Sequence, residues 1–122
     1  MKLFLILGAI NGFLAVALGA FGAHGLEGKL SEKAIDTYEK AVTYQMFHTM
    51  ALLVTGLLLV KFQSGGLIWA GWMFFVGILL FSGSLYIYSI TQIKTFAMIT
   101  PLGGVAFLIG WILLGYVVAK HL

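Results

Sequence analysis

Seven polar residues could carry chemistry in an otherwise apolar chain. They are His24, Tyr44, Gln45, His48, Ser82, Ser84 and Thr100. Imidazole, hydroxyl and amide groups of this kind can bind a polar solute, relay a proton or form a nucleophile–base pair. His48 follows Tyr44 by four positions and Gln45 by three, a spacing that puts all three on one face of a helix. The seven residues are the candidate binding site of the chain.

Each specific chemistry lacks a partner that it requires. Bis-histidine haem ligation needs His24 and His48 at matching depth, but His24 stands at the end of an apolar stretch. The third histidine, His121, is close to the C-terminus, and the absence of cysteine excludes thiolate metal sites. A serine nucleophile needs a carboxylate nearby, but all acidic residues lie within 27–39. We therefore expect no catalytic residue, metal or cofactor, while a proton step at His48 stays open.

The elements that position these residues are four uncharged apolar stretches. Hydrophobic residues make up 61% of the 122 residues and charged residues 9%, and the mean hydropathy of +1.07 is far above that of soluble proteins. About 20 apolar residues, at a rise of about 1.5 Å each, cross the roughly 30 Å core of a bilayer. We therefore expect an all-α membrane protein with one domain over 1–122, a four-helix transmembrane bundle. The expected spans are residues 3–23, 41–60, 66–90 and 99–119.

The connector 26–40 between spans one and two holds most of the charge. Seven of the eleven charged residues lie between Glu27 and Lys40. Ser31 is a suitable helix N-cap, and beyond it apolar and charged side chains fall on opposite helix faces. We expect a short amphipathic interfacial helix that lies at the membrane surface and leads into span two.

Proline and tyrosine residues predict the start of span four and the membrane interface at the end of span three. Thr100 and Pro101 suit the N-cap and first position of span four, because proline there loses no hydrogen bond. A longer, kinked helix that starts near Thr95 is the alternative. Tyr86 and Tyr88 predict an aromatic belt at one membrane interface.

Small residues recur at helical spacing in spans one and four. The predicted helix-packing residues are Gly8, Asn11, Gly12, Gly19, Gly103 and Gly110. Glycine stripes let the backbones of two helices approach closely, and Asn11, near the midplane, needs a partner on another helix. A single four-helix bundle needs fewer small-residue faces than this for its own packing. The sequence therefore predicts a homo-oligomer or a membrane-protein partner.

Polar residues gather in one half of the predicted bundle. Four antiparallel spans place all seven candidate residues on the side of the first connector, and His48 lies roughly 10 Å deep. Two interpretations stay open. The residues line a polar vestibule that opens to that side, or they form hydrogen bonds between helices that fix the packing.

Five short motifs follow one another along the chain. They read GAFGAHGL at 19–26, YQxxH at 44–48, FSGSLY at 81–86, ITPLGG at 99–104 and GW at 110–111. In these motifs the chain resembles the YwdK/YgdD family of small bacterial membrane proteins, a group of unknown function. The resemblance implies a multi-pass protein of the bacterial plasma membrane, and it brings no activity or catalytic residue.

The leading functional hypothesis is therefore a non-enzymatic protein that acts by assembly in the lipid bilayer, as a homo-oligomer or an accessory subunit. The alternative is an oligomeric transporter or channel for a small neutral or weakly basic solute, with its site around His48. A protein that binds or modifies lipids is a third possibility. Nucleic-acid binding is disfavoured, because the lysines stand singly and there is no arginine. Lysines are also too evenly spread to set the membrane orientation.

Overall fold

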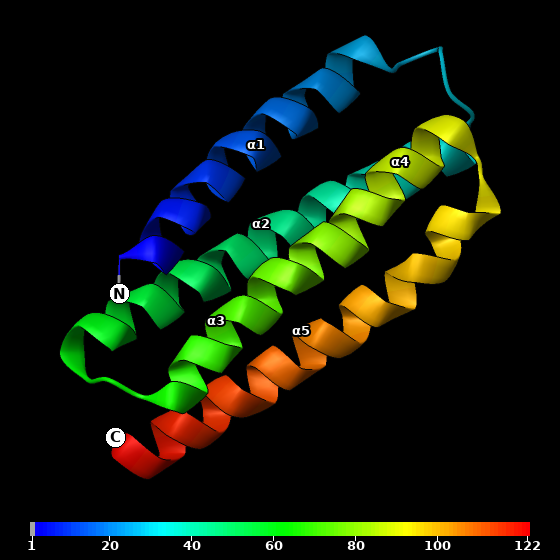
Figure 1. Ribbon diagram of the computed structural model, residues 1–122. Coiled ribbons are helices and arrows are strands. Elements are labelled where there is room, and N and C mark those ends of the chain that lie inside the picture. Colours follow the sequence, from blue (N-terminus) through cyan, green and yellow to red (C-terminus); the bar gives the residue numbers. More distant parts are fainter. Residues whose placement is uncertain (1) are drawn as a thin grey trace.

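The chain folds almost entirely into helices. A computed structural model describes residues 2–122 (Figure 1). The elements are α1 Leu3–Gly25, α2 Glu32–Lys61, α3 Gly65–Gly77, the π-helical η1 Ile78–Gly83, α4 Ser84–Thr91 and α5 Lys94–His121. Because α3, η1 and α4 follow without a break, they form one long helix. The structure thus has four helices that are long and apolar enough to cross a membrane, as the sequence predicted.

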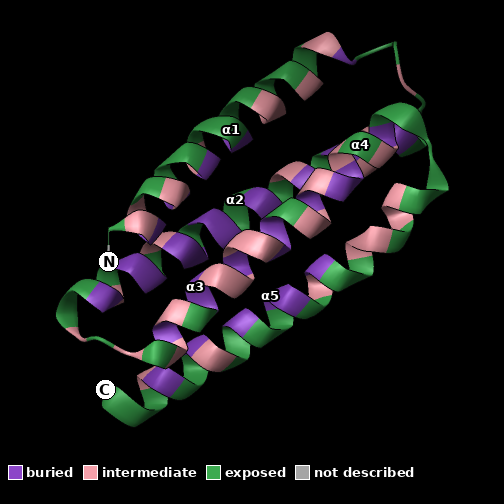
Figure 2. Cartoon of the chain, viewed as in Figure 1, coloured by how far each residue is buried: buried purple, intermediate pink, exposed green. Residues whose placement is uncertain are grey.

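The four long helices run antiparallel, so both chain ends lie at the same end of the molecule (Figure 1). α1 packs along α2, α2 packs against α3 and α4, and α5 packs along α3, η1 and α4. α1 and α5 therefore flank the central pair. Buried residues concentrate on α2 and on the inner face of the α3–α4 helix, whereas much of α1 is exposed (Figure 2).

The apolar core fills the half of the bundle nearest the chain ends. Its main members are Phe4, Leu52, Leu59, Leu67, Phe74, Ile78, Phe107, Leu114 and Val117. Phe4 brings α1 into this core and meets Trp72 edge-on, with 5.4 Å between the ring centroids. Between membrane helices such contacts stabilise by van der Waals packing, because lipid tails are as apolar as leucine.

Glycines set the close approach of α1 to α2. Gly8, Gly12 and Gly19 all face α2, and a Cβ at Gly8 would lie 2.6 Å from the Leu53 side chain. The small-residue face predicted for span one is therefore packed against α2 within the chain, although Gly12 also borders a hollow at the surface. It does not provide the surplus packing surface on which the expectation of an oligomer rested.

The glycines of α5 are used in the same way. Gly103 lies so close to η1 that a Cβ would collide with the backbone of Phe81. Gly110 faces the ring of Phe74, and a Cβ there would lie 2.8 Å from it. Both contacts hold α5 against the α3–α4 helix.

The second span is longer than the sequence predicts. Ser31 caps α2 as expected, with its Oγ accepting a hydrogen bond from the Ala34 amide at 3.1 Å. Residues 32–40 are helical and amphipathic, but they continue into the span as one helix and form no separate surface helix. A continuous helix keeps the backbone hydrogen bonds that a bend at the surface would break.

The fourth span also begins earlier than residue 99. α5 starts at Lys94 and contains Pro101 in its interior, so the N-cap assignment of Thr100 is wrong and the longer helix of the alternative is right. Proline removes one donor from the helix and weakens it locally. Neighbouring helices and hydroxyl side chains support such a residue in a membrane helix, and the Thr100 hydroxyl lies 3.4 Å from the Phe96 carbonyl oxygen.

Replacing Gly103 with alanine should loosen the contact between α5 and η1. The new methyl group meets the Phe81 backbone, which cannot move aside as a side chain can. We expect the free energy of unfolding to fall by about 1–3 kcal/mol, measured in detergent by denaturant titration and circular dichroism. Gly115→Ala is the matched control because no atom lies within 4 Å of its Cβ position. Equal stability of the two variants would contradict this packing.

Candidate functional site

Gln45 joins three helices through its amide. Its Nε2 donates to Asn11 Oδ1 on α1 at 3.1 Å, and the Tyr86 hydroxyl on α4 donates to Gln45 Oε1 at 2.7 Å. Asn11 Nδ2 in turn donates to the Leu7 carbonyl at 2.9 Å. This chain of hydrogen bonds ties α1 and α4 to the buried face of α2.

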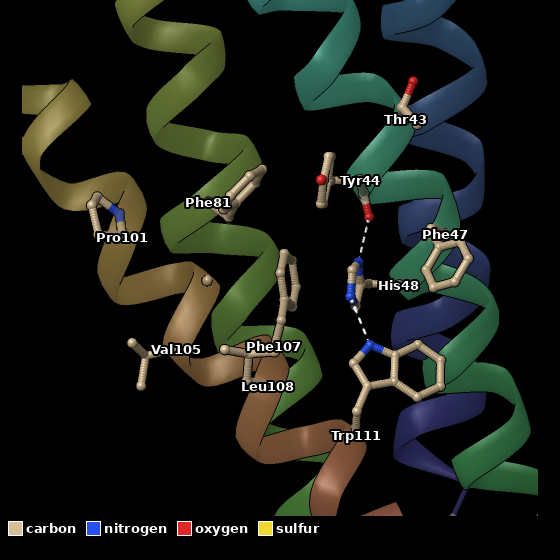
Figure 3. A pocket seen from close by; sticks show the side chains of 11 residues that line it. Thr43, Tyr44, Phe47, His48, Phe81, Pro101, Val105, Phe107, Leu108 and Trp111 are labelled. Carbon is tan, nitrogen blue, oxygen red and sulfur yellow. Dashed lines mark hydrogen bonds between the residues drawn. The ribbon is translucent and has the colours of Figure 1, made fainter.

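His48 joins α2 to α5. Its Nδ1 lies 2.8 Å from the Tyr44 carbonyl oxygen, and Trp111 Nε1 lies 3.0 Å from its Nε2 (Figure 3). A carbonyl only accepts and an indole N–H only donates, so the imidazole is neutral with its proton on Nδ1. The ring also stacks on Phe107, with centroids 3.5 Å apart and planes 9° from parallel. A proton relay through His48 would have to break one of its hydrogen bonds.

Ser82 and Ser84 bind different neighbours. The Ser82 hydroxyl donates to the Ala41 carbonyl of α2 at 2.8 Å, whereas the Ser84 hydroxyl lies 2.6 Å from the Thr100 hydroxyl of α5. Residues two positions apart point to opposite sides of a helix, so the pair links the α3–α4 helix to α2 and to α5. The π-helical turn η1, which no pattern in the sequence predicted, ends between the two serines.

The seven predicted site residues therefore form separate hydrogen-bonded groups. Tyr44 contributes its carbonyl oxygen, while its side chain is 40% exposed. His24 lies exposed at the end of α1, and the structure does not bring it to the others. Within residues 2–122, no buried side-chain nitrogen or oxygen lacks a hydrogen-bond partner. This arrangement supports the interpretation in which the polar residues fix helix packing.

Three residues of these groups were missed in the sequence. The sequence places Tyr86 in an interfacial belt, but its hydroxyl lies inside and bonds to Gln45. Phe107 and Trp111, which contact the His48 ring, carried no predicted role, and Trp111 entered only as part of the GW motif. The sequence does contain a signal for Trp111. An indole N–H inside a membrane span needs a hydrogen-bond acceptor, and His48 supplies one.

A groove of about 750 Å³ opens beside His48, between α2 and α5. Its walls come from Tyr44, Phe47, Phe81, Pro101, Phe107 and Trp111, with His48 at the back (Figure 3). Nearly all of this lining is carbon, so the groove suits an apolar group better than a polar solute. Within the part of the chain described, no three His, Cys, Asp or Glu residues gather to hold a metal ion.

Comparison with known proteins identifies the family. The profile of a protein family of unknown function, DUF423, matches residues 18–104. The UPF0382 membrane protein YwdK of Bacillus subtilis (strain 168) is 54% identical over 123 residues, which cover 100% of both chains. The chain belongs to this family. Other DUF423 relatives include UPF0382 membrane proteins of Staphylococcus aureus (strain bovine RF122), 57% identical, and Staphylococcus epidermidis (strain RP62A), 56% identical, each over 93% of both chains.

These matches confirm the family resemblance seen in the five motifs. They establish a membrane protein and bring no activity, so the roles of residues in this DUF423 chain rest on its own geometry. No solved structure matches the chain.

Removing the Gln45 amide should cost stability. Gln45→Leu leaves Asn11 Oδ1 and the Tyr86 hydroxyl without their partner, so we expect the free energy of unfolding to fall by about 1–3 kcal/mol. Adding Asn11→Leu should restore part of the loss, because both partners are then apolar. Gln63→Leu is the matched control: that amide, in the connector after α2, bonds only to the Leu59 carbonyl four residues earlier. A double mutant no more stable than Gln45→Leu would contradict the bond between α1 and α2.

The hydrogen bonds of His48 predict one imidazole tautomer. In a protein labelled with ¹⁵N-histidine and reconstituted in bilayers, the His48 spectrum should show a protonated Nδ1 and an unprotonated Nε2 near neutral pH. Trp111→Phe removes the N–H donor and should shift the Nε2 resonance of His48 alone. Observation of the Nε2–H tautomer in the unaltered protein would contradict the geometry.

Proposed function

We propose that this protein is a non-enzymatic integral protein of the bacterial plasma membrane that acts by association with a second copy of itself in the bilayer. The observation that carries the proposal is an exposed ridge on α2, between the flanking helices α1 and α5. The ridge consists of Met46, Phe47, Met50 and Val54, which are 45–60% exposed.

A hollow lies on each side of this ridge. Toward α1, a hollow of about 550 Å³ is bordered by Gly12 and Ala15. Toward α5, a smaller hollow of about 250 Å³ is bordered by Trp111 and Leu114. Phe47 and Met50 line both, so a two-fold dimer can place the ridge of one copy in a hollow of the other. Methionine side chains adapt well to such a surface.

The hydrogen bonds of the site support a role without catalysis. Gln45, His48 and the two serines bind other helices and leave no nucleophile–base pair directed at a substrate. The bacterial relatives and the four apolar helices support a place in the plasma membrane.

Transport by an oligomer is the competing function, and the lining of the groove and hollows supports it less. A polar solute needs hydrogen-bonding partners along its path, whereas these openings are bordered mainly by carbon atoms. A different membrane protein seated on the α2 ridge is the other form that association can take.

Cysteine crosslinking in native membranes tests the proposal, since the chain contains no cysteine of its own. With Met50→Cys, a thiol-specific crosslinker of short reach should give a covalent dimer of twice the chain mass. Ile112→Cys on α5 is the control, because residue 112 is 70% exposed but lies off the ridge. It should stay monomeric under the same conditions.

Three results would contradict association through the ridge. The first is that Met50→Cys yields only monomer. The second is that Met50→Cys and Ile112→Cys yield equal amounts of dimer, and the third is a crosslinked adduct whose mass shows a different protein. Uptake of a small solute that Met50→Trp leaves unchanged and His48→Ala abolishes would favour the transport alternative.

A further inference from the structure

We propose that the groove between α2 and α5 binds one anionic phospholipid, with an acyl chain along the groove and the phosphate near the lysines above it. The site lies beside the ridge on α2 and goes beyond the association proposed above. The groove and the hollow toward α5 share Phe47 and Trp111, so a lipid in the groove requires that a second copy use the hollow toward α1.

The length of the groove matches one leaflet of a bilayer. Along α5 it runs from Pro101 to Trp111, ten residues apart, or about 15 Å at 1.5 Å per residue. The hydrocarbon core of a bilayer is about 30 Å thick, so one leaflet contributes about 15 Å. At the inner end of the groove, Trp111 is held in place by its hydrogen bond to His48. An acyl chain of the leaflet next to the first connector therefore fits the groove lengthwise.

The lining of the groove changes from polar to apolar with depth, as a phospholipid changes from its ester groups to its acyl chains. Thr43 and Tyr44, at the end nearest the first connector, carry hydroxyl groups, and the Tyr44 side chain is exposed (Figure 3). Deeper residues such as Phe107 and Leu108 are wholly apolar. Hydroxyl donors at this level suit the ester carbonyl groups of a lipid, and the rings below them suit its chain.

Positive charge stands above the groove on α2. Lys33, Lys40 and Phe47 are spaced by seven residues, so both lysines share the helix face that lines the groove. The carboxylates of this segment are not confined to the opposite face, because Asp36 shares the face of the two lysines and Glu39 precedes Thr43 by four residues. Lys40 is nevertheless the charged residue of this segment closest to the apolar part of the groove.

α5 adds a second cation on the other side of the opening. Lys94 precedes Pro101 by seven residues, and α5 contains no acidic residue. Asp36, on the same α2 face as the lysines, lies a turn farther from the membrane than Lys40. Three lysines, Lys33, Lys40 and Lys94, thus stand against the carboxylates of Asp36 and Glu39, and the net positive charge of the opening is complementary to a phosphate. Each lysine near a membrane surface raises affinity for an anionic lipid by about five-fold.

The same charge argues against a second copy of the chain as the occupant of this groove. Two copies that met here would bring the same lysines together, and like charges repel. The lysines attract a zwitterionic lipid less strongly, because the positive group of its own headgroup neutralises the nearby phosphate. An anionic phospholipid satisfies both the apolar lining and the lysines.

Trp111 provides a direct probe of the site. In a Trp69→Phe, Trp72→Phe background it is the one tryptophan left in the chain. This protein would be reconstituted in phosphatidylcholine vesicles that contain chain-brominated phosphatidylglycerol or, at the same mole fraction, chain-brominated phosphatidylcholine. Bromine quenches tryptophan on contact. We expect the phosphatidylglycerol form to quench Trp111 at a mole fraction at least five-fold lower.

Two pairs of variants test the chain and the phosphate separately. Gly104→Leu should abolish the preference by filling the groove, since a Cβ there lies 3.9 Å from the Phe81 ring and causes no clash. Gly115→Leu, in open space on the same helix, should keep it. Lys40→Gln and Lys94→Gln should each lower the preference about five-fold, whereas Lys61→Gln, at the far end of α2, should not.

Equal quenching by the two brominated lipids would overturn the proposal, because the groove would then hold ordinary bilayer lipid. Absence of quenching by either lipid would also overturn it, since protein would then cover Trp111. A preference that Gly104→Leu leaves intact, in a variant whose circular dichroism is unchanged, would place the lipid elsewhere.

Discussion

A polar group inside a bilayer must find its hydrogen-bond partner within the protein, and the structure depends on how α2 meets this requirement. Each unsatisfied group in the hydrocarbon core costs several kcal/mol. The Gln45 amide binds α1 and α4, the His48 ring binds α5, and the Ala41 carbonyl accepts from Ser82 of η1. These bonds connect α2 to every other long helix in the half of the bundle nearest the first connector. The opposite half is held by apolar packing around residues such as Phe74, which stabilises the bundle without fixing one register.

Two departures from regular α-helix lie beside the groove. Pro101 interrupts the hydrogen bonds of α5, and η1 widens the facing turn of the α3–α4 helix. Gly103 keeps the two helices in contact between these points. α5 is thereby joined to the α3–α4 helix along its length but meets α2 mainly through side chains, with the His48–Trp111 bond as the polar link. Aromatic rings fill part of the space left between α2 and α5, and the rest is the groove.

Much of the fold could be predicted from local signals. Uncharged stretches fix the number of spans, Ser31 marks the start of α2, and the short connector after Lys61 makes the second and third spans neighbours. Depth in the membrane was predictable for the same reason, because it follows from counting residues. The side of a helix from which a side chain meets its neighbours could not be predicted in this way. His24 was therefore grouped with residues that it does not contact. The pairing of His48 with Trp111 joins residues 63 positions apart, and no local pattern encodes it. The π-helical turn likewise has no signal in the local sequence.

The central claim is that the polar residues of α2 are a dry framework between helices and line no water-filled path. Water-edited solid-state NMR of ¹⁵N-histidine protein in bilayers tests this claim most directly. His24 is exposed at the end of α1 and serves as an internal reference. The account predicts rapid transfer of magnetisation from water to His24 and little or none to the buried His48 ring. Transfer to His48 as rapid as to His24 would show that water reaches the middle of α2, and it would contradict the account.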